Sequence, residues 1–197
     1  VMTSLRRLLP RAFTPFFHRF PRPTPVQVAG IPPILAGRDV LLCAPTAAGK
    51  TEAYAAPLVE RLLGGNRGPG RVLLVSPTRA LANDLKRRLE GPMHQAGVGL
   101  GRYTGEHKER SGGRLAEVVV ATPEAWDSLL ARRPGELAEL AAVVLDEVHI
   151  LDGTPRGDQV RILLHRLGKP GCQRIGASAT VDRPGEVAVR YGLGGEV

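Results

Sequence analysis

Short apolar runs alternate with longer segments of helical periodicity along most of the chain, and this alternation restricts the fold strongly. The runs are almost continuously apolar, which is typical of strands that are buried on both faces of a sheet. Strand followed by helix, repeated about five times, predicts an α/β fold with a parallel sheet sandwiched between helices. The expected strands span residues 39–44, 71–76, 98–104, 117–122, 140–147 and 172–180.

Helix boundaries are marked by glycine and proline. The segment "KTEAYAAPLVERLLGG" reads as a helix closed by Gly64 and Gly65, and "TRALANDLKRRLE" as one ended by Gly91-Pro92. Pro123 opens the helix "PEAWDSLLARR", in which Trp126 is expected to be a core residue. A last clear helix covers residues 159–167, "QVRILLHRL". The run Lys86-Arg87-Arg88 is interpreted as a solvated helix face rather than a binding patch.

Polar clusters follow five of the expected strands. Ligands of open parallel sheets bind at the carboxyl ends of the strands, so these clusters are expected to share one edge of the sheet. A chain that only has to fold has no need to collect polar groups there, and the pattern therefore indicates a binding or catalytic site. The clusters are Ala44–Thr51, Ser76–Arg79, Thr122–Glu124, Asp146–His149 and Ser178–Thr180.

Length and composition are those of one globular domain. The chain has 197 residues, 43% of them hydrophobic and 23% charged, which is enough to bury a core. No apolar run approaches the roughly 18–20 residues of a membrane-spanning helix, so we expect no membrane partner and a cytoplasmic location. The basic N-terminus lacks the features of a secretory signal. Cys43 and Cys172 have no metal-binding or disulfide spacing.

Basic residues are in excess. Lys and Arg number 27 against 19 Asp and Glu, a formal net charge of +8. This balance favours a polyanionic partner, nucleic acid first, although a base-composition bias of the source genome would produce the same excess.

The segment "APTAAGKT" (residues 44–51, the phosphate loop below) lies between an expected strand and an expected helix. Its last three residues fit a phosphate-binding loop, whereas Ala44 stands where the general pattern has glycine. Gly49 allows close backbone approach, the Lys50 ammonium can contact the β- and γ-phosphates of ATP, and the Thr51 hydroxyl can bind Mg²⁺. A plain strand–helix turn is the alternative. The residues expected to bind the nucleotide here are Thr46, Ala47, Ala48, Gly49, Lys50 and Thr51.

Two carboxylates end the apolar strand "VVLDEVHI". Asp146 can hold Mg²⁺, and Glu147 is then placed to polarise an attacking water. A helix-capping pair is the alternative for this sequence alone, but an upstream phosphate loop makes it much weaker. His149 is expected to couple the nucleotide site to neighbouring segments. The expected catalytic residues are therefore Lys50, Asp146, Glu147 and His149.

Six short segments, in the order in which they occur along the chain, resemble the first RecA-like lobe of a superfamily 2 nucleic-acid helicase. The Asp-Glu-Val-His form and the following "DGTPRGDQVRILLHRL" look most like the Lhr (large helicase-related) group, with Ski2-like and DEAD/DEAH-box RNA helicases as the alternatives. The resemblance implies a RecA-like P-loop NTPase domain at residues 23–197, preceded by an extension at residues 1–22. The segments are "PTPVQ" (23–27), "APTAAGKT" (44–51), "SPTRALA" (76–82), "ATPE" (121–124), "DEVH" (146–149) and "SAT" (178–180).

The resemblance also implies roles for single residues. Gln27 would recognise the adenine edge, and either Phe20 or Arg22 would stack on the base. Ser178 and Thr180 would link the nucleotide state to nucleic-acid binding. The resemblance further implies contacts with the sugar-phosphate backbone, with Arg79 the leading candidate for a phosphate contact and a solvated cation the alternative. The residues on this side are Pro77, Thr78, Arg79, Thr104, Gly105, Thr122, Pro123 and Glu124.

The implied function is the ATP-binding motor lobe of an ATP-dependent DNA or RNA helicase or translocase. Its cofactors would be ATP and Mg²⁺, and its partners single-stranded or duplex DNA, or RNA. A second RecA-like lobe would supply arginine fingers, worth roughly 10³–10⁵ in rate in related phosphoryl-transfer systems. No such segment occurs in the sequence, so we expect this chain to bind nucleotide weakly and to hydrolyse ATP poorly. A nucleotide-dependent nucleic-acid-binding module without efficient hydrolysis is the competing interpretation.

Overall fold

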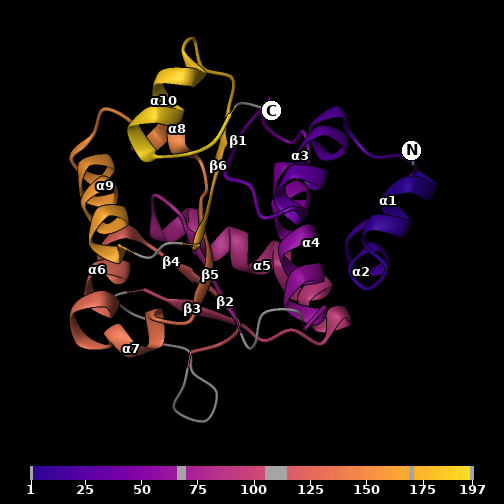
Figure 1. Cartoon of the computed structure of the whole chain (residues 1–197), viewed down its shortest axis with the longest axis horizontal. Helices are drawn as coiled ribbons and strands as arrows, with labels where there is room; N and C mark the ends of the chain where they lie inside the picture. The colour runs from indigo at the N-terminus through magenta and orange to yellow at the C-terminus, as the bar shows by residue number, and fades with distance from the viewer. Residues whose placement is uncertain (1, 66–69, 105–114, 169–170, 196–197) are drawn as a thin grey trace.

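A single parallel sheet forms the centre of the molecule (Figure 1). The computed structural model describes residues 2–65, 70–104, 115–168 and 171–195. The sheet has six strands in the order β1-β6-β5-β2-β4-β3, and every neighbouring pair is parallel. The predicted fold class is therefore confirmed. The strands are β1 (Val40–Cys43), β2 (Arg71–Val75), β3 (Leu100–Tyr103), β4 (Val118–Ala121), β5 (Leu140–Leu145) and β6 (Gln173–Ser178).

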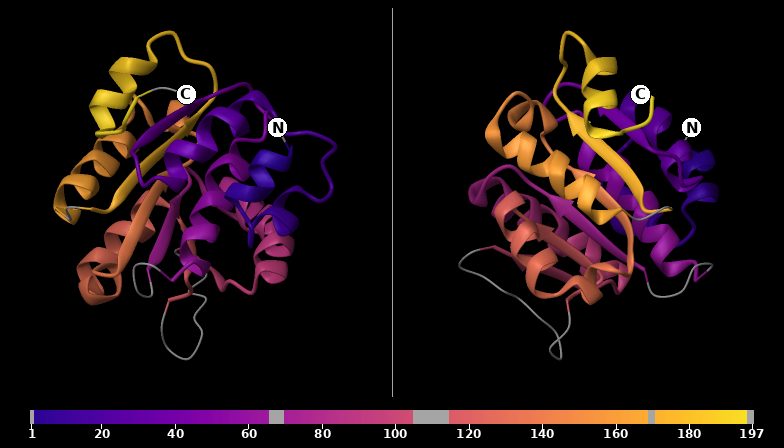
Figure 2. Two further views of the ribbon diagram at one scale, coloured as in Figure 1. Left: turned by 45° about the vertical axis from the view of Figure 1, so that its right-hand side comes forward. Right: turned by 60° about the vertical axis from the view of Figure 1, so that its left-hand side comes forward.

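Helices cover both faces of this sheet, and the two views of Figure 2 bring first one helical layer and then the other forward. Side chains alternate across a strand, so Leu42 and Leu74 enter one hydrophobic cluster while Leu41 and Leu73 enter the other. The first layer contains α1 (Met2–Leu8), α2 (Phe13–Phe17), α3 (Pro25–Leu35), α4 (Lys50–Leu63) and α5 (Arg79–Ala96). The second contains α6 (Pro123–Arg132), α7 (Pro134–Leu137), α8 (Val148–Leu151), α9 (Pro155–Leu167) and α10 (Pro184–Tyr191).

The N-terminal segment contributes to the first cluster. Leu9 and Phe17 of this segment are fully buried there. The carboxylate of Glu60 on α4 accepts the backbone N–H groups of Arg11 and Ala12 and also forms an ion pair with the Arg11 guanidinium at 2.9 Å. The extension expected at residues 1–22 thus contains two helices that are attached to the helix following the phosphate loop.

The C-terminal end of α5 differs from the prediction. The helix continues past Gly91 and Pro92 to Ala96 and ends at Gly97, whose φ of 70° is left-handed. Pro92 and Met93 are buried against the sheet, so tertiary packing outweighs the helix-breaking tendency of the Gly-Pro pair. Trp126 has no exposed surface, which confirms its expected core position. In the described part of the chain no helix is long and apolar enough to cross a membrane.

Candidate functional site

The phosphate loop joins β1 to α4 at the carboxyl edge of the sheet. Gly49 caps the N-terminus of α4 with a left-handed φ of 84°, and Ala47 also has a positive φ, of 62°. A Cβ atom at position 49 would lie 2.2 Å from Nε2 of Gln27. Both backbone conformation and space therefore require glycine at this position.

The Lys50 side chain folds back onto its own loop. Its Nζ donates hydrogen bonds to the carbonyl oxygens of Ala44 at 2.7 Å and Pro45 at 2.9 Å, and the residue is only 7% exposed. The ammonium thus lies within the loop that the sequence predicts to hold phosphate. A bound phosphate would replace the Ala44 and Pro45 carbonyl groups as the partner of the Lys50 ammonium.

The start of α3 supports the loop from the other side. Thr24 Oγ1 donates to the Ala48 carbonyl at 2.7 Å, and Gln27 Nε2 donates to the Gly49 carbonyl at 3.1 Å. Gln27 Oε1 accepts the Thr24 N–H at 2.9 Å, as in a capping box, and Gln27 is 3% exposed. The Gln27 amide therefore positions the phosphate loop in this structure. The adenine contact implied for it stays a prediction.

The acid pair follows β5, which lies between β2 and β6 in the sheet. Asp146 is 5% exposed, and its backbone N–H donates to the Val75 carbonyl at 2.8 Å. Burial and the neighbouring Glu147 charge raise the pKa of the Asp146 carboxyl to about 7, against the opposing charges of Arg88 and Lys50. Glu147 adopts a left-handed φ of 53° at the start of α8. The phosphate loop and the acid pair thus lie within electrostatic reach of each other.

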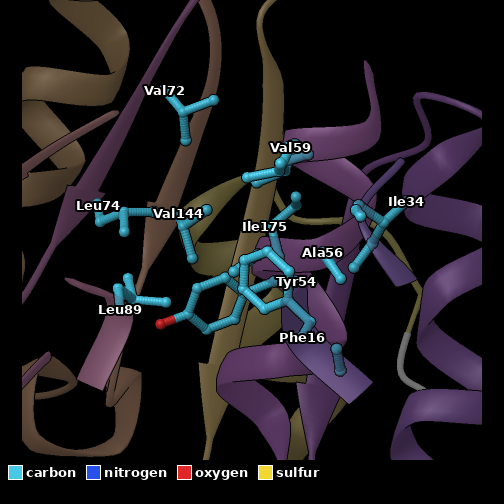
Figure 3. Close-up of a cluster of buried hydrophobic side chains, with 14 of the residues drawn as sticks. Phe16, Ile34, Tyr54, Ala56, Val59, Val72, Leu74, Leu89, Val144 and Ile175 are labelled. Carbon is cyan, nitrogen blue, oxygen red and sulfur yellow. The ribbon is translucent and has the colours of Figure 1, made fainter. Parts of the chain in front are cut away.

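Tyr54, one turn after Thr51 on α4, is a site residue that the sequence analysis missed. Its ring lies in the first hydrophobic cluster with Leu89 and Val144, as Figure 3 shows. Its hydroxyl is buried beside Thr51 and Asp146. Burial and the Asp146 charge raise the pKa of Tyr54 well above its usual value. An aromatic residue in a buried helix face is usually core, so no sequence pattern distinguishes this position.

Arg88 is a second missed residue. Its Nη1 donates to Thr51 Oγ1 at 3.2 Å, and its Nε lies 3.2 Å from Asp84 Oδ2. The interpretation of residues 86–88 as a solvated face agrees with Arg87 and Arg88, whose side chains are 78% and 49% exposed, although Arg88 also reaches Thr51. A charged run on an amphipathic helix does not reveal which of its members points toward the adjoining helix.

His149 connects the acid pair to the segment after β6. The Ala179 backbone N–H donates to His149 Nδ1 at 3.0 Å, and the same nitrogen lies 3.5 Å from Glu147 Oε2. On either side of Ala179, Ser178 is fully buried and Thr180 is exposed. The structure therefore brings three of the predicted segments into one continuous path along the sheet edge, from the loop to the acid pair to residues 178–180.

The residues expected to contact nucleic acid gather at two helix starts. Thr78 and Thr122 are the N-caps of α5 and α6, where their hydroxyl oxygens accept N–H groups of the first helical turn. These helices follow β2 and β4, which are neighbours in the sheet. Arg79 is exposed beside Thr78, and Thr104 is buried.

The remaining expected residues of this edge are prolines, a glycine and an acid. Pro77 and Pro123 are buried where their chain segments turn into helices, and Gly105 lies outside the described residues. Glu124 forms an ion pair with Arg156 on α9, with Arg156 Nε 2.7 Å from Glu124 Oε1. Although burial opposes it, hydrogen bonding from its own backbone N–H and from Arg156 lowers the pKa of Glu124. The Glu124 carboxylate therefore lies in a surface expected to contact phosphates, and Arg156 balances its negative charge.

Comparison with known proteins identifies the family. The DEAD/DEAH box helicase family model matches residues 24–187, most of the chain. The chain belongs to the DEAD/DEAH box helicase family. Within this family it is similar to an Lhr helicase/probable uracil glycosylase of Mycolicibacterium smegmatis, with 34% identity over 88% of this chain. It is also similar to an ATP-dependent DNA helicase Hel308 of Methanocaldococcus jannaschii, with 29% identity over 77% of this chain.

A solved structure supports the same fold for this DEAD/DEAH box helicase domain. The DEAD-box helicase Mss116, described as bound to single-stranded RNA and UDP-BeF, superposes with a TM-score of 0.79 and 23% identity. That match covers 99% of this chain and 44% of Mss116. The expected superfamily 2 first RecA-like lobe is thus confirmed, with an Lhr helicase among its relatives. The chain spans only 13% of the length of each of the two curated relatives named above.

Proposed function

We propose that this chain is the ATP-binding motor lobe of a nucleic-acid-dependent helicase or translocase. The observation that supports it most is the placement of the phosphate loop and the Asp146-Glu147 pair at one edge of the sheet, where the charges of Lys50 and Arg88 act on Asp146. A chain that used the loop only as a turn has no reason to bury a carboxylate beside it.

The site residues fit a magnesium nucleotide. Thr51 offers a hydroxyl and Asp146 a carboxylate, and Mg²⁺ prefers such oxygen ligands in small number beside phosphates. Asp146 is a buried acid next to a second acid, and a divalent cation would relieve the repulsion between the two carboxylates. When bound, Mg²⁺ would neutralise charge on the β- and γ-phosphates. Thr51 and Asp146 would hold the metal ion.

The other site residues bind the phosphates, orient the attacking water and connect neighbouring segments. Lys50 leaves the Ala44 and Pro45 carbonyls and contacts the β- and γ-phosphates. Glu147, beside the metal ligand, orients the attacking water and accepts its proton. His149 links Glu147 to the backbone at Ala179, so that a shift of the acid pair reaches residues 178–180.

The starts of α5 and α6 form the proposed nucleic-acid surface. Helix N-termini and hydroxyl side chains suit sugar-phosphate contacts, which hold a strand without reading its sequence. The exposed Arg79 adds a positive charge, in keeping with the excess of basic residues in the chain. The similarity to the Hel308 relative, which is named as an ATP-dependent DNA helicase, supports nucleic acid as the partner and makes DNA the first choice.

A second RecA-like lobe in the longer protein completes hydrolysis in this proposal. The test is nucleotide binding and ATPase activity of the full-length protein, with single-stranded DNA and RNA compared as stimulators at stated salt. Lys50→Ala should weaken nucleotide binding, whereas Glu147→Gln should keep binding and abolish turnover. Equal, measurable turnover in Glu147→Gln and wild type would contradict the water-orienting role of Glu147, whereas nucleotide binding without turnover in wild type would favour a binding module.

The isolated 197-residue chain provides a separate test. We expect it to bind ADP or ATP weakly and to hydrolyse ATP slowly, because the arginine fingers are expected on another lobe. A fast, nucleic-acid-stimulated ATPase from this chain alone would overturn the requirement for a second lobe.

A further inference from the structure

Arg88 places a positive charge beside the two proposed metal ligands. Its guanidinium donates to Thr51 Oγ1 at 3.2 Å from α5, a helix that begins at the proposed nucleic-acid surface. Burial and Glu147 raise the pKa of Asp146, and the Arg88 charge leads the influences that lower it. Arg88 therefore acts electrostatically on both Thr51 and Asp146.

Lys50 also acts electrostatically on Asp146, but its ammonium is directed into its own loop. Its ammonium is held by the Ala44 and Pro45 carbonyls, at 2.7 and 2.9 Å. Arg88 is instead the cation in hydrogen-bond contact with the Thr51 hydroxyl. The hydroxyl oxygen that a magnesium ion would need is thus already occupied by a cationic group.

We propose that Arg88 acts as a placeholder for Mg²⁺ and moves from Thr51 to Asp84 when the metal-nucleotide complex binds. The inference rests on the proposed function. Two cations cannot share one hydroxyl oxygen at close range without strong repulsion. Binding of the metal and the Arg88–Thr51 contact therefore oppose each other, and each weakens the other by the same factor.

Asp84 is the natural receiver for the displaced side chain. It lies one helical turn before Arg88, and its Oδ2 is already 3.2 Å from Arg88 Nε. The Arg88 side chain is 49% exposed, so it can rotate along the surface of α5 without disturbing the core. The other carboxylate oxygen, Oδ1, contacts Arg87 at 2.6 Å, which leaves Oδ2 available to Arg88.

The experiment is a Mg²⁺ titration of fluorescent ADP-analogue binding to the 197-residue chain, with no turnover involved. Arg88→Gln should lower the half-saturating Mg²⁺ concentration by about fivefold, since a competing charge is removed. Arg87→Gln is the matched control, because it deletes the same charge from the same helix without a contact to Thr51. Its half-saturating Mg²⁺ concentration should stay within about twofold of the wild-type value. Asp84→Asn should raise the half-saturating concentration, because the receiver is lost.

The outcomes separate this inference from the proposed function. Arg88→Lys keeps the charge and should remain close to wild type. A half-saturating concentration in Arg88→Gln that equals the Arg87→Gln value, or exceeds wild type, would overturn the placeholder role. A half-saturating Mg²⁺ concentration that is lower in Asp84→Asn than in wild type would also overturn the placeholder role, even if Arg88→Gln failed to fold. If wild type bound no nucleotide at any Mg²⁺ concentration, the proposed function itself would fail, and this inference with it.

Discussion

The backbone N–H of Ala179 donates to Nδ1 of His149 over 3.0 Å, and this bond joins the acid pair to the segment that follows β6. The bond crosses between two chain segments that are 30 residues apart in sequence. It needs an imidazole whose Nδ1 carries no proton, since only then can that nitrogen accept. The 3.5 Å approach of the same nitrogen to Glu147 Oε2 places the water-orienting acid of the proposed mechanism at the same junction.

His149→Ala removes this junction. The Ala179 N–H loses its acceptor, so we expect the free energy of unfolding to fall by about 1 kcal/mol. In the full-length protein, the ratio of nucleic-acid-stimulated to unstimulated ATPase rate should also fall, because the path from the acid pair to residues 178–180 is broken. Urea denaturation and steady-state ATPase assays measure the two effects. An unchanged ratio would show that the bond is only structural.

Asp146→Asn should stabilise the metal-free chain at alkaline pH. The folded-state pKa of about 7 lies above the usual carboxyl value of 3.8, so the folded state binds the proton more tightly. This contribution to stability is complete below pH 3.8 and is lost as the pH rises through 7. The amide carries no charge, so its advantage should grow from near zero at pH 4 to on the order of 1 kcal/mol or more at pH 8. Thermal unfolding in EDTA at both pH values tests this, and a constant difference in Tm would contradict it.

Glu60→Ala should destabilise the chain by about 2–4 kcal/mol. The buried carboxylate accepts two backbone N–H groups and the Arg11 guanidinium, and alanine leaves all three donors without it. Protease digestion should then cut first near residues 9–12, where the connection between α1 and α2 loosens. The exposed Glu186 on α10, which pairs with Arg183, is the control, and its replacement by alanine should change stability by less than about 0.5 kcal/mol.

Two glycines in the first helical layer should respond in opposite directions to alanine. Gly49→Ala places a Cβ 2.2 Å from Gln27 Nε2 at a φ of 84°, so we expect a loss of more than about 1 kcal/mol and weaker nucleotide binding. At Gly91, inside α5, a Cβ meets nothing within 4 Å. Gly91→Ala should therefore raise stability by about 0.5–1 kcal/mol. Equal changes in the free energy of unfolding of the two variants, measured by calorimetry, would contradict this argument from backbone conformation.

The sequence was sufficient to predict the six strands, because long apolar runs bounded by turn residues allow few other structures. It did not predict their order, since β6 lies between β1 and β5, and this depends on how the helices pack on the two faces rather than on any local pattern. The helices at residues 2–8 and 13–17 were missed for a related reason. The apolar residues of such short segments show no clear helical period. In the fold, α2 packs on α4 and α5, and Leu5 of α1 enters the same hydrophobic cluster.

The site residues that could be predicted are those that directly follow a strand and carry a side chain of recognisable chemistry. Gly49, Lys50 and Asp146 stand at strand–helix junctions whose position the strands fix, so their meeting at one edge followed from the fold class. Arg88 and Tyr54 lie within helices, where only rotation about the helix axis decides what a side chain contacts. That rotation is set by packing, and a single sequence does not contain it.

The Lys50 ammonium, held by the carbonyls of Ala44 and Pro45, gives the loop an internal ligand of its own. A small anion such as inorganic phosphate would have to draw this side chain away while offering few contacts in return. A polyphosphate also reaches the loop amides and the acid edge of the sheet, and so compensates for the two carbonyl bonds that are broken. The loop should therefore favour ligands long enough to bridge both segments over simple phosphate.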